Sequence, residues 1–476
     1  MYDGAATSVL NYRVEIHLAN QSQCDTGTAV SQESGLRRVL TLSDLVFYGI
    51  VLIQPIAAVP LFGIADRLSR GHVVTTILIA MIAMMLTAIS YGRMATKYPT
   101  AGSAYTYVSH GLNAHLGFLA GWAMILDYLL IPVLNVIYGA LTLARIISIL
   151  PYWAWAAILS ALITFLNVRG IKSTARANIV LLVLMCGVIG TFMLLAIHYL
   201  LHLGGMGALF SSQPFYTPGA TDLSSIATAT SLAALTYIGF DGVTTLSEEV
   251  KNPERNVLRA TVLVCFITGV FSAAQVYLAQ RVWPDYTSFP NVETAFMDIS
   301  RRVGGASLFG AMAFTLILAS LGSGLGGQAG AARVLFGMGR EGALPRKVFG
   351  HLDSGNGVPT WNLWMVGIFA FAGSLLLDFE RAAELLNFGA FLAFMGVNLA
   401  AMKQFYFEDR AGRSKHWFKN LLLPALGFLF CFWICWSLPR PAKAVGGLWL
   451  VAGVIYLAFM TSGFRRRPVQ MDFMDS

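Results

Sequence analysis

The residues best placed to do chemistry lie between Ser231 and Pro253, in the stretch SLAALTYIGFDGVTTLSEEVKNP. The stretch begins as an apolar run that could span a membrane, but Gly239, Asp241 and Gly242 interrupt it. A carboxylate at bilayer depth is costly, so it must face a cavity or a partner. The two glycines weaken the helix at the same point by about 1 kcal/mol each.

We therefore interpret this stretch as a discontinuous helix whose unwound backbone lines a cavity at membrane depth. Free amides and carbonyls at such a break bind charged solutes, and helices broken in this way are typical of secondary transporters. The alternative is a glycine-rich packing face in which Asp241 forms a structural salt bridge.

A second interruption occurs in YGIVLIQPIAAVPLFG, where Gln54 and Pro55 break the apolar run and Pro60 follows. Proline removes a backbone donor and leaves carbonyls of the preceding turn free. Two interrupted helices in corresponding places of two halves indicate the binding site of a transporter.

The elements that must position these residues are membrane helices. The chain is 56% hydrophobic and 12% charged, and its mean hydropathy is +0.65. These values lie far outside the range of soluble proteins, so we expect an all-α polytopic protein in a lipid bilayer. The expected spans are 42–64, 73–94, 116–143, 152–168, 178–201, 224–247, 259–280, 304–336, 360–377, 382–402, 421–438 and 445–462.

The distribution of basic residues predicts the orientation. With the N-terminus in the cytoplasm, cytoplasmic connections and the C-terminal end carry 22 Lys and Arg, external loops carry 9, and Arg13 lies in the N-terminal tail. This bias places both ends inside. It also explains the basic pI without a nucleic-acid partner.

Further polar residues fall inside the expected spans. Tyr128, Asn135 and Thr142 recur every seven residues and share one helix face, which predicts Tyr128 in a substrate wall and Asp127 in a hydrogen bond between helices. Ser320 and Ser323 lie on a glycine-rich face, where they serve either an ion or close helix packing.

Two more sets of polar residues have simpler interpretations. Asn387 and Asn398 are expected to bond neighbouring helices. Tyr98, Tyr105 and Tyr107, between the second and third spans, suit a segment along the cytoplasmic membrane surface, either as an anchoring belt or as a gate.

The sequence contains no recognisable catalytic arrangement. It has no nucleophile elbow, no phosphate loop and no metal-ligand cluster of useful spacing. We therefore expect no enzymatic activity, no cofactor and no metal ion.

Several motifs, in this order, resemble those of the amino acid/polyamine/organocation (APC) permeases: YPTAGSAYTY, HLGFLAGWAMILDYLL, NVRGIKSTA, GFDGVTTLSEEVKNP and AARVLFGMGREGALP. The resemblance extends from about Leu40 to the end of the tenth span. Within this superfamily, phrases such as LDYLL and FDGVTTLSEE are most similar to those of bacterial putrescine importers and related amino acid permeases.

The resemblance implies the leucine-transporter-type fold in a bacterial inner membrane, with alternating access usually driven by protons. Its parts would be a cytoplasmic tail, a ten-helix core of two inverted repeats, two added helices and a cytoplasmic C-terminal tail. These would occupy 1–40, 41–402 (repeats 41–202 and 222–402), 403–463 and 464–476.

The resemblance also implies site residues. The first break would offer amides and carbonyls to the carboxylate and amine of a substrate, at Gln54, Pro55, Ile56 and Ala57. The second break would complete the pocket, with aromatic side chains as lid or wall, at Tyr237, Ile238, Gly239, Phe240 and Asp241. Tyr128 matches the tyrosine of the Asp-Tyr pair in the third helix.

Two departures from the family pattern affect the prediction. Pro60 stands where diamine importers are expected to have a carboxylate, and an unpaired buried ammonium is costly, which favours an amino acid substrate. Met185 lies near the position of a coupling lysine in proton-coupled relatives. Asp241 is then the expected titrating group, and sodium held by Ser320 and Ser323 is the competing interpretation.

We thus expect a secondary transporter that imports an amino acid or a related organic cation with protons. The alternatives are a polyamine importer of the same fold and a membrane nutrient sensor that binds without transport. The sequence does not decide whether the chain forms a homodimer through its last two helices.

Overall fold

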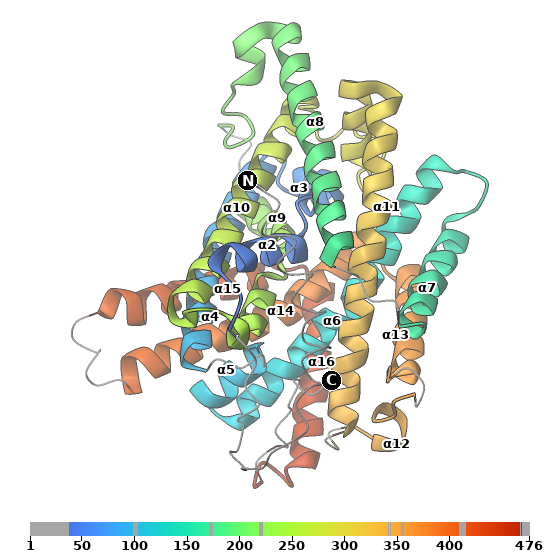
Figure 1. The fold of residues 1–476 in the computed structure, drawn as a ribbon. Helices are drawn as coiled ribbons and strands as arrows, with labels where there is room; N and C mark the ends of the chain where they lie inside the picture. Colours follow the sequence, from blue (N-terminus) through green and yellow to red (C-terminus); the bar gives the residue numbers. More distant parts are fainter. Residues whose placement is uncertain are drawn as a thin grey trace, which may run out of the picture. The chain divides into compact units, whose positions relative to one another are not determined.

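The computed structural model describes residues 38–98, 103–170, 175–218, 222–340, 342, 344–353, 357–408, 416–466 and 468. The expected N-terminal tail up to residue 37 therefore lies outside the described residues. In the described part the chain is helical apart from turns, loops and one isolated bridge between Leu40 and Val250. Figure 1 shows the helices in chain order.

The first half of the described chain contains α2 (Leu42–Ile53), α3 (Ala58–Leu68), α4 (Val73–Lys97), α5 (Ser103–Gly111), α6 (Ala114–Ile146), α7 (Tyr152–Val168) and α8 (Ala175–Leu209). The next part contains α9 (Leu223–Ala233), the 3-10 helices η1 (Ala234–Tyr237) and η2 (Phe240–Glu249), α10 (Pro253–Val282), α11 (Ala295–Arg340), α12 (Arg346–Phe349), α13 (Thr360–Leu376) and α14 (Phe379–Met402). The last part contains the π-helical turns η3 (Lys403–Glu408) and η4 (Phe418–Leu422), then α15 (Leu423–Ser437) and α16 (Arg440–Met460).

The helices confirm a polytopic membrane protein. Nine helical segments of the described residues are long and apolar enough to cross a bilayer, and the bent pair α2 and α3 forms one more span. The apolar helices α7 and α13 occupy two further expected positions but have only 17 residues each. The count of twelve spans therefore stays a prediction.

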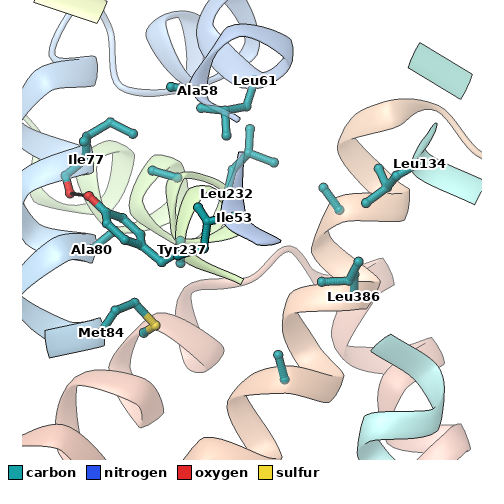
Figure 2. Packing of buried hydrophobic residues seen from close by; sticks show 14 of the residues in the cluster. Ile53, Ala58, Leu61, Ile77, Ala80, Met84, Leu134, Leu232, Tyr237 and Leu386 are labelled. Carbon is teal, nitrogen blue, oxygen red and sulfur yellow. Dashed lines mark hydrogen bonds between the residues drawn. The ribbon is translucent and has the colours of Figure 1, made fainter. Parts of the chain in front are cut away.

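The buried core lies among the helices that surround the two interrupted helices, α2 with α3 and α9 with η2. The helix α4 packs along α10, and α6 packs against both α11 and α14. The half-helices α2 and η2 contact each other, and both contact α10. Figure 2 shows one part of this core, where Ile53 of α2 and Leu232 of α9 lie among side chains of α4 and α14.

The last two helices are attached to the outside of this core. Only 33% of the apolar window of α15 and 17% of that of α16 is buried. The helix α16 is nevertheless held to α6 specifically, since the Trp122 indole donates to the Trp449 carbonyl at 2.9 Å and the Trp449 indole donates to the Trp122 carbonyl at 3.0 Å. Exposed apolar faces on α15 and α16 are what a lipid-facing position requires.

Side-chain caps mark the outer ends of the two interrupted helices. The Asp44 carboxylate accepts from the Thr41 amide at 2.8 Å where α2 begins. The Asp222 carboxylate accepts from the Ser225 amide at 3.1 Å where α9 begins. These bonds satisfy amides that a helix N-terminus leaves without an intrahelical partner.

Candidate functional site

The structure confirms a break in the first interrupted helix. The axes of α2 and α3 differ by 60°, and the chain leaves the helical path at Gln54, whose φ of 67° is in the left-handed region. Pro55 follows and provides no amide to continue the helix. No side chain caps the N-terminus of α3 at Ala57. The Ala57 and Val59 amides donate to the Gln54 and Ile56 carbonyls, both at 3.0 Å, so only the remaining amides of this end are available to a ligand.

Two glutamine contacts hold this break in place. The Gln54 amide nitrogen Nε2 donates to the Ala319 carbonyl of α11 at 3.4 Å. The fully buried Gln275 of α10 donates to the Pro55 carbonyl at 3.0 Å. The break is therefore clamped between α10 and α11, and its backbone is only partly saturated by these bonds.

The second break lies directly beside the first. After η1 ends at Tyr237, Ile238 is extended and Gly239 has a φ of 110° before η2 begins, again without a side-chain cap. A Cβ on Gly239 would lie 3.6 Å from the carbonyl carbon and oxygen of Leu52. The start of η2 therefore lies beside the end of α2, next to the first break.

Asp241 follows this break and is 8% exposed. None of the ion pairs in the described chain involves it, so a structural salt bridge is not what holds it. Asp127 and Tyr128 of α6 lie within electrostatic range of its carboxylate. The Oδ1 atom of Asp127 is buried without a hydrogen-bond partner among the described residues, so the expected bond between helices is not found at that oxygen.

The aromatic residues of the second break are held by packing. Tyr237 is fully buried, and its hydroxyl donates to the Ile77 carbonyl at 2.9 Å (Figure 2). The Phe240 ring is also fully buried and lies 5.4 Å from the Tyr91 ring and 5.2 Å from the Phe394 ring. Ile238 and Gly239, between them, are partly exposed.

Tyr128 and the two serines lie on the α6 and α11 side of the site. Tyr128 is partly exposed and packs on Gly330, where an added Cβ would lie 3.3 Å from its ring. The Ser323 hydroxyl accepts a hydrogen bond from Asn135 at 3.0 Å. The Ser320 side chain faces Gly139, whose added Cβ would lie 3.3 Å from the serine Cβ. Both serines therefore contribute to packing of α11 on α6.

Other polar residues lie close to the expectations. Asn387 donates to the Ser231 carbonyl at 2.6 Å, and Asn398 donates to the Thr87 hydroxyl at 3.2 Å, which confirms their bonds to neighbouring helices. The expectation of a surface belt is wrong for Tyr105 and Tyr107. Their side chains are buried because α5 packs into the angle between α6 and α14.

Sequence reasoning missed two residues. Gln275, which clamps the first break, appears in the sequence only as a polar residue within an apolar helix. Glu384 of α14 is 4% exposed, and its signal was an acid three positions before Asn387 inside an expected span. Both are polar groups at bilayer depth, the same kind of signal that drew attention to Asp241.

The chain matches a protein-family model over most of its length. The model described as "Amino acid permease" matches residues 50–455. The match includes both breaks, Tyr128 and the two serines of α11. It covers all of the described helices from the second half of α2 to most of α16.

The relatives that this chain resembles differ from one another in their substrates. The chain is 34% identical over 439 residues to the low-affinity putrescine importer PlaP of Escherichia coli K12, covering 92% of this chain and 96% of that protein. It is 27% identical to the branched-chain amino acid permease BcaP of Lactococcus lactis, covering 90% and 95%. It is 29% identical to the vacuolar cationic amino acid transporter 4 of Arabidopsis thaliana, covering 77% and 63%.

Proposed function

Because the chain belongs to the amino acid permease family, we propose that it imports an amino acid or a related organic cation across the bacterial inner membrane by alternating access, coupled to protons. Membership of this family makes the protein a membrane transporter of amino acids or polyamines, not a member of an enzyme family. The observation that carries the proposal is the meeting of two uncapped helix breaks beside a buried carboxylate.

The proposed binding mode follows from the groups at the breaks. The free amides at the start of α3, after Gln54 to Ala57, would bind the carboxylate of an amino acid, because helix N-termini attract anions. Carbonyls near Pro55 and Gly239 would accept from its amine. The Tyr128 ring would form one wall of the pocket. Tyr237 and Phe240 would line it with their backbone, because their rings are buried in the packing behind it.

The proposed transport cycle uses the breaks as hinges. Two interrupted helices, α2 with α3 and α9 with η2, stand first in the two proposed five-helix repeats. Short half-helices joined by unwound backbone can tilt separately, so one side of the site closes while the other opens. The clamps from Gln54 and Gln275 would keep the site at a fixed depth during this motion.

We assign proton coupling to Asp241. Its carboxylate is buried beside the backbone amides of Gly239 and Gly242 and has no basic partner among the described residues. Binding of a proton would neutralise this buried charge. Sodium bound by Ser320 and Ser323 is the competing proposal, although the contacts of both serines with α6 already account for their positions.

The test is uptake into proteoliposomes of purified protein. Radiolabelled amino acids and 1,4-diaminobutane are supplied with and without an inward proton gradient. Accumulation above equilibrium only with the gradient supports the proposal. The Asp241→Asn variant should accumulate the best substrate at least about tenfold less, because the titrating carboxylate at the site is gone.

The control for this test is Asp285→Asn, which alters an exposed loop acid that bonds only within its own turn. It should transport like the wild-type protein. Accumulation by Asp241→Asn equal to wild type removes Asp241 from the mechanism. Tight substrate binding without any uptake by the wild-type protein favours a sensor.

A further inference from the structure

Carboxylates gather where the N-terminal end of α14 meets the segment before α11, and they are Glu293, Asp378, Glu380 and Glu384. Two of them have basic partners. Arg67 of α3 lies 3.8 Å from Glu380, and Arg381 lies 3.5 Å from Asp378. Glu293 and Glu384 have no ion pair within the described ranges, so acidic groups outnumber basic groups in the cluster.

The outer part of this cluster borders a cavity of about 320 Å³. Glu293 and Asp378 supply its carboxylates, and Tyr152 and Ser374 also line it. Burial and the nearby Asp378 carboxylate raise the pKa of Glu293 above its ordinary value. A cavity with two acids and apolar walls suits a small organic cation better than an anion.

The inner part of the cluster follows one face of α14. Glu380, Glu384 and Asn387 are spaced by four and three residues, so they share a face. Glu380 contacts Arg67 of α3, and Asn387 bonds the Ser231 carbonyl of α9. This face therefore points toward the two interrupted helices, and it descends about 10 Å from Glu380 to Asn387.

Glu384 is the most buried acid on this face. It is 4% exposed, and none of the ion pairs among the described residues involves it. The Oδ1 atom of Asn387, one turn deeper, is also buried without a partner there. An enclosed acceptor without a donor is costly, and a cation bound between the Asn387 oxygen and the Glu384 carboxylate would supply that donor.

We propose that Glu384 and the Asn387 carbonyl oxygen form a subsite for the ammonium group of a cationic substrate, between the cavity at Glu293 and the helix breaks. The subsite rests on the proposed transport function and specifies its substrate class as a diamine or a basic amino acid. It also supplies a carboxylate for the second ammonium group of a diamine, which Pro60 in the first interrupted helix does not. The acid is contributed by α14 instead of the first helix.

The test compares substrates that differ in charge. Uptake of 1,4-diaminobutane, lysine and leucine into proteoliposomes is measured for wild type, Glu384→Gln and Glu384→Asp. The Gln variant should raise KM for the diamine and lysine at least about tenfold, because a charge-assisted bond is lost, and leave that for leucine unchanged. The Asp variant keeps the charge and should recover part of the difference.

The matched control is Asp298→Asn, which removes an acid near the same end of the helices that pairs with Arg145 at 2.7 Å. It should shift none of the three KM values. Unchanged KM for both cations in Glu384→Gln overturns the subsite. An equal loss of all three substrates also overturns it, because the carboxylate would then serve coupling by a proton or sodium.

A second measurement needs no variant. The wild-type protein should be stabilised against heat more by 1,4-diaminobutane than by 1-aminobutane at equal concentration, because carbonyls at the breaks would bind one ammonium group and Glu384 the other. Equal stabilisation contradicts the subsite. A wild-type protein that transports leucine alone also overturns the subsite but retains the transporter, whereas one that transports nothing refutes the proposed function itself.

Discussion

The hydroxyl of Tyr237 is bound by α4, since it donates to the Ile77 carbonyl at 2.9 Å within a fully buried environment. We predict that Tyr237→Phe lowers stability by about 1 kcal/mol, the usual net value of one hydrogen bond. Its KM for substrate should stay at the wild-type value, because the hydroxyl points away from the breaks. Thermal unfolding and uptake kinetics of the purified variant measure both effects.

Tyr128→Phe is the matched comparison for this prediction. Tyr128 is partly exposed and lies within electrostatic range of Asp241, so loss of its hydroxyl should raise KM. A higher KM in Tyr237→Phe with unchanged stability would show that Tyr237 contacts substrate directly.

Single polar residues explain how far the site was predictable. Asp241, Gln54 and Pro55 stand out in apolar runs, so their importance follows from the cost of polar groups in a bilayer. That cost does not predict whether a side chain points into the site or into the packing between helices. The sequence does not distinguish Tyr107, Tyr128 and Tyr237, which are all tyrosines in or beside expected spans. The packing of neighbouring helices decides which ring is buried.

The second break depends on the backbone of one glycine. Gly239 has a φ of 110°, where a side chain is strained, although an added Cβ would have ordinary contacts with Leu52. We predict that Gly239→Ala destabilises the protein by about 1–3 kcal/mol. Transport should fall strongly, because η2 can no longer leave α9 at the same angle. Thermal unfolding and uptake by the same preparation measure the two effects.

Gly187→Ala is the control for the break. Gly187 lies in α8 on an exposed face, and an added Cβ there meets nothing within 4 Å. Alanine should maintain or improve the helix. Equal behaviour of the two variants would contradict a special backbone at Gly239.

Helix ends were less predictable than helix positions. Each expected span contains a helix, but α8 continues to Leu209 beyond a kink at Gly204 and Gly205, and α11 begins at Ala295 before a kink at Gly304 and Gly305. Hydropathy detects where a segment is apolar. It does not show that a helix continues with a new direction after two glycines.

The orientation of the chain determines which side the acidic cluster faces. With every expected span crossing once, Arg67, Glu293 and Asp378 follow an odd number of crossings, as does Ser212 after α8. His351, after α11, follows an even number. The bias of 22 against 9 basic residues therefore predicts Ser212 and the acidic cluster outside and His351 inside.

Single-cysteine variants measure this orientation. In a background without the five native cysteines, Ser212→Cys and His351→Cys each place a thiol on an exposed side chain. A membrane-impermeant maleimide should label Ser212→Cys in intact cells and His351→Cys only after permeabilisation. The reverse pattern would turn the acidic cluster toward the cytoplasm, where it would serve substrate release instead of uptake. Labelling of both in intact cells would contradict the odd number of crossings expected between Ser212 and His351.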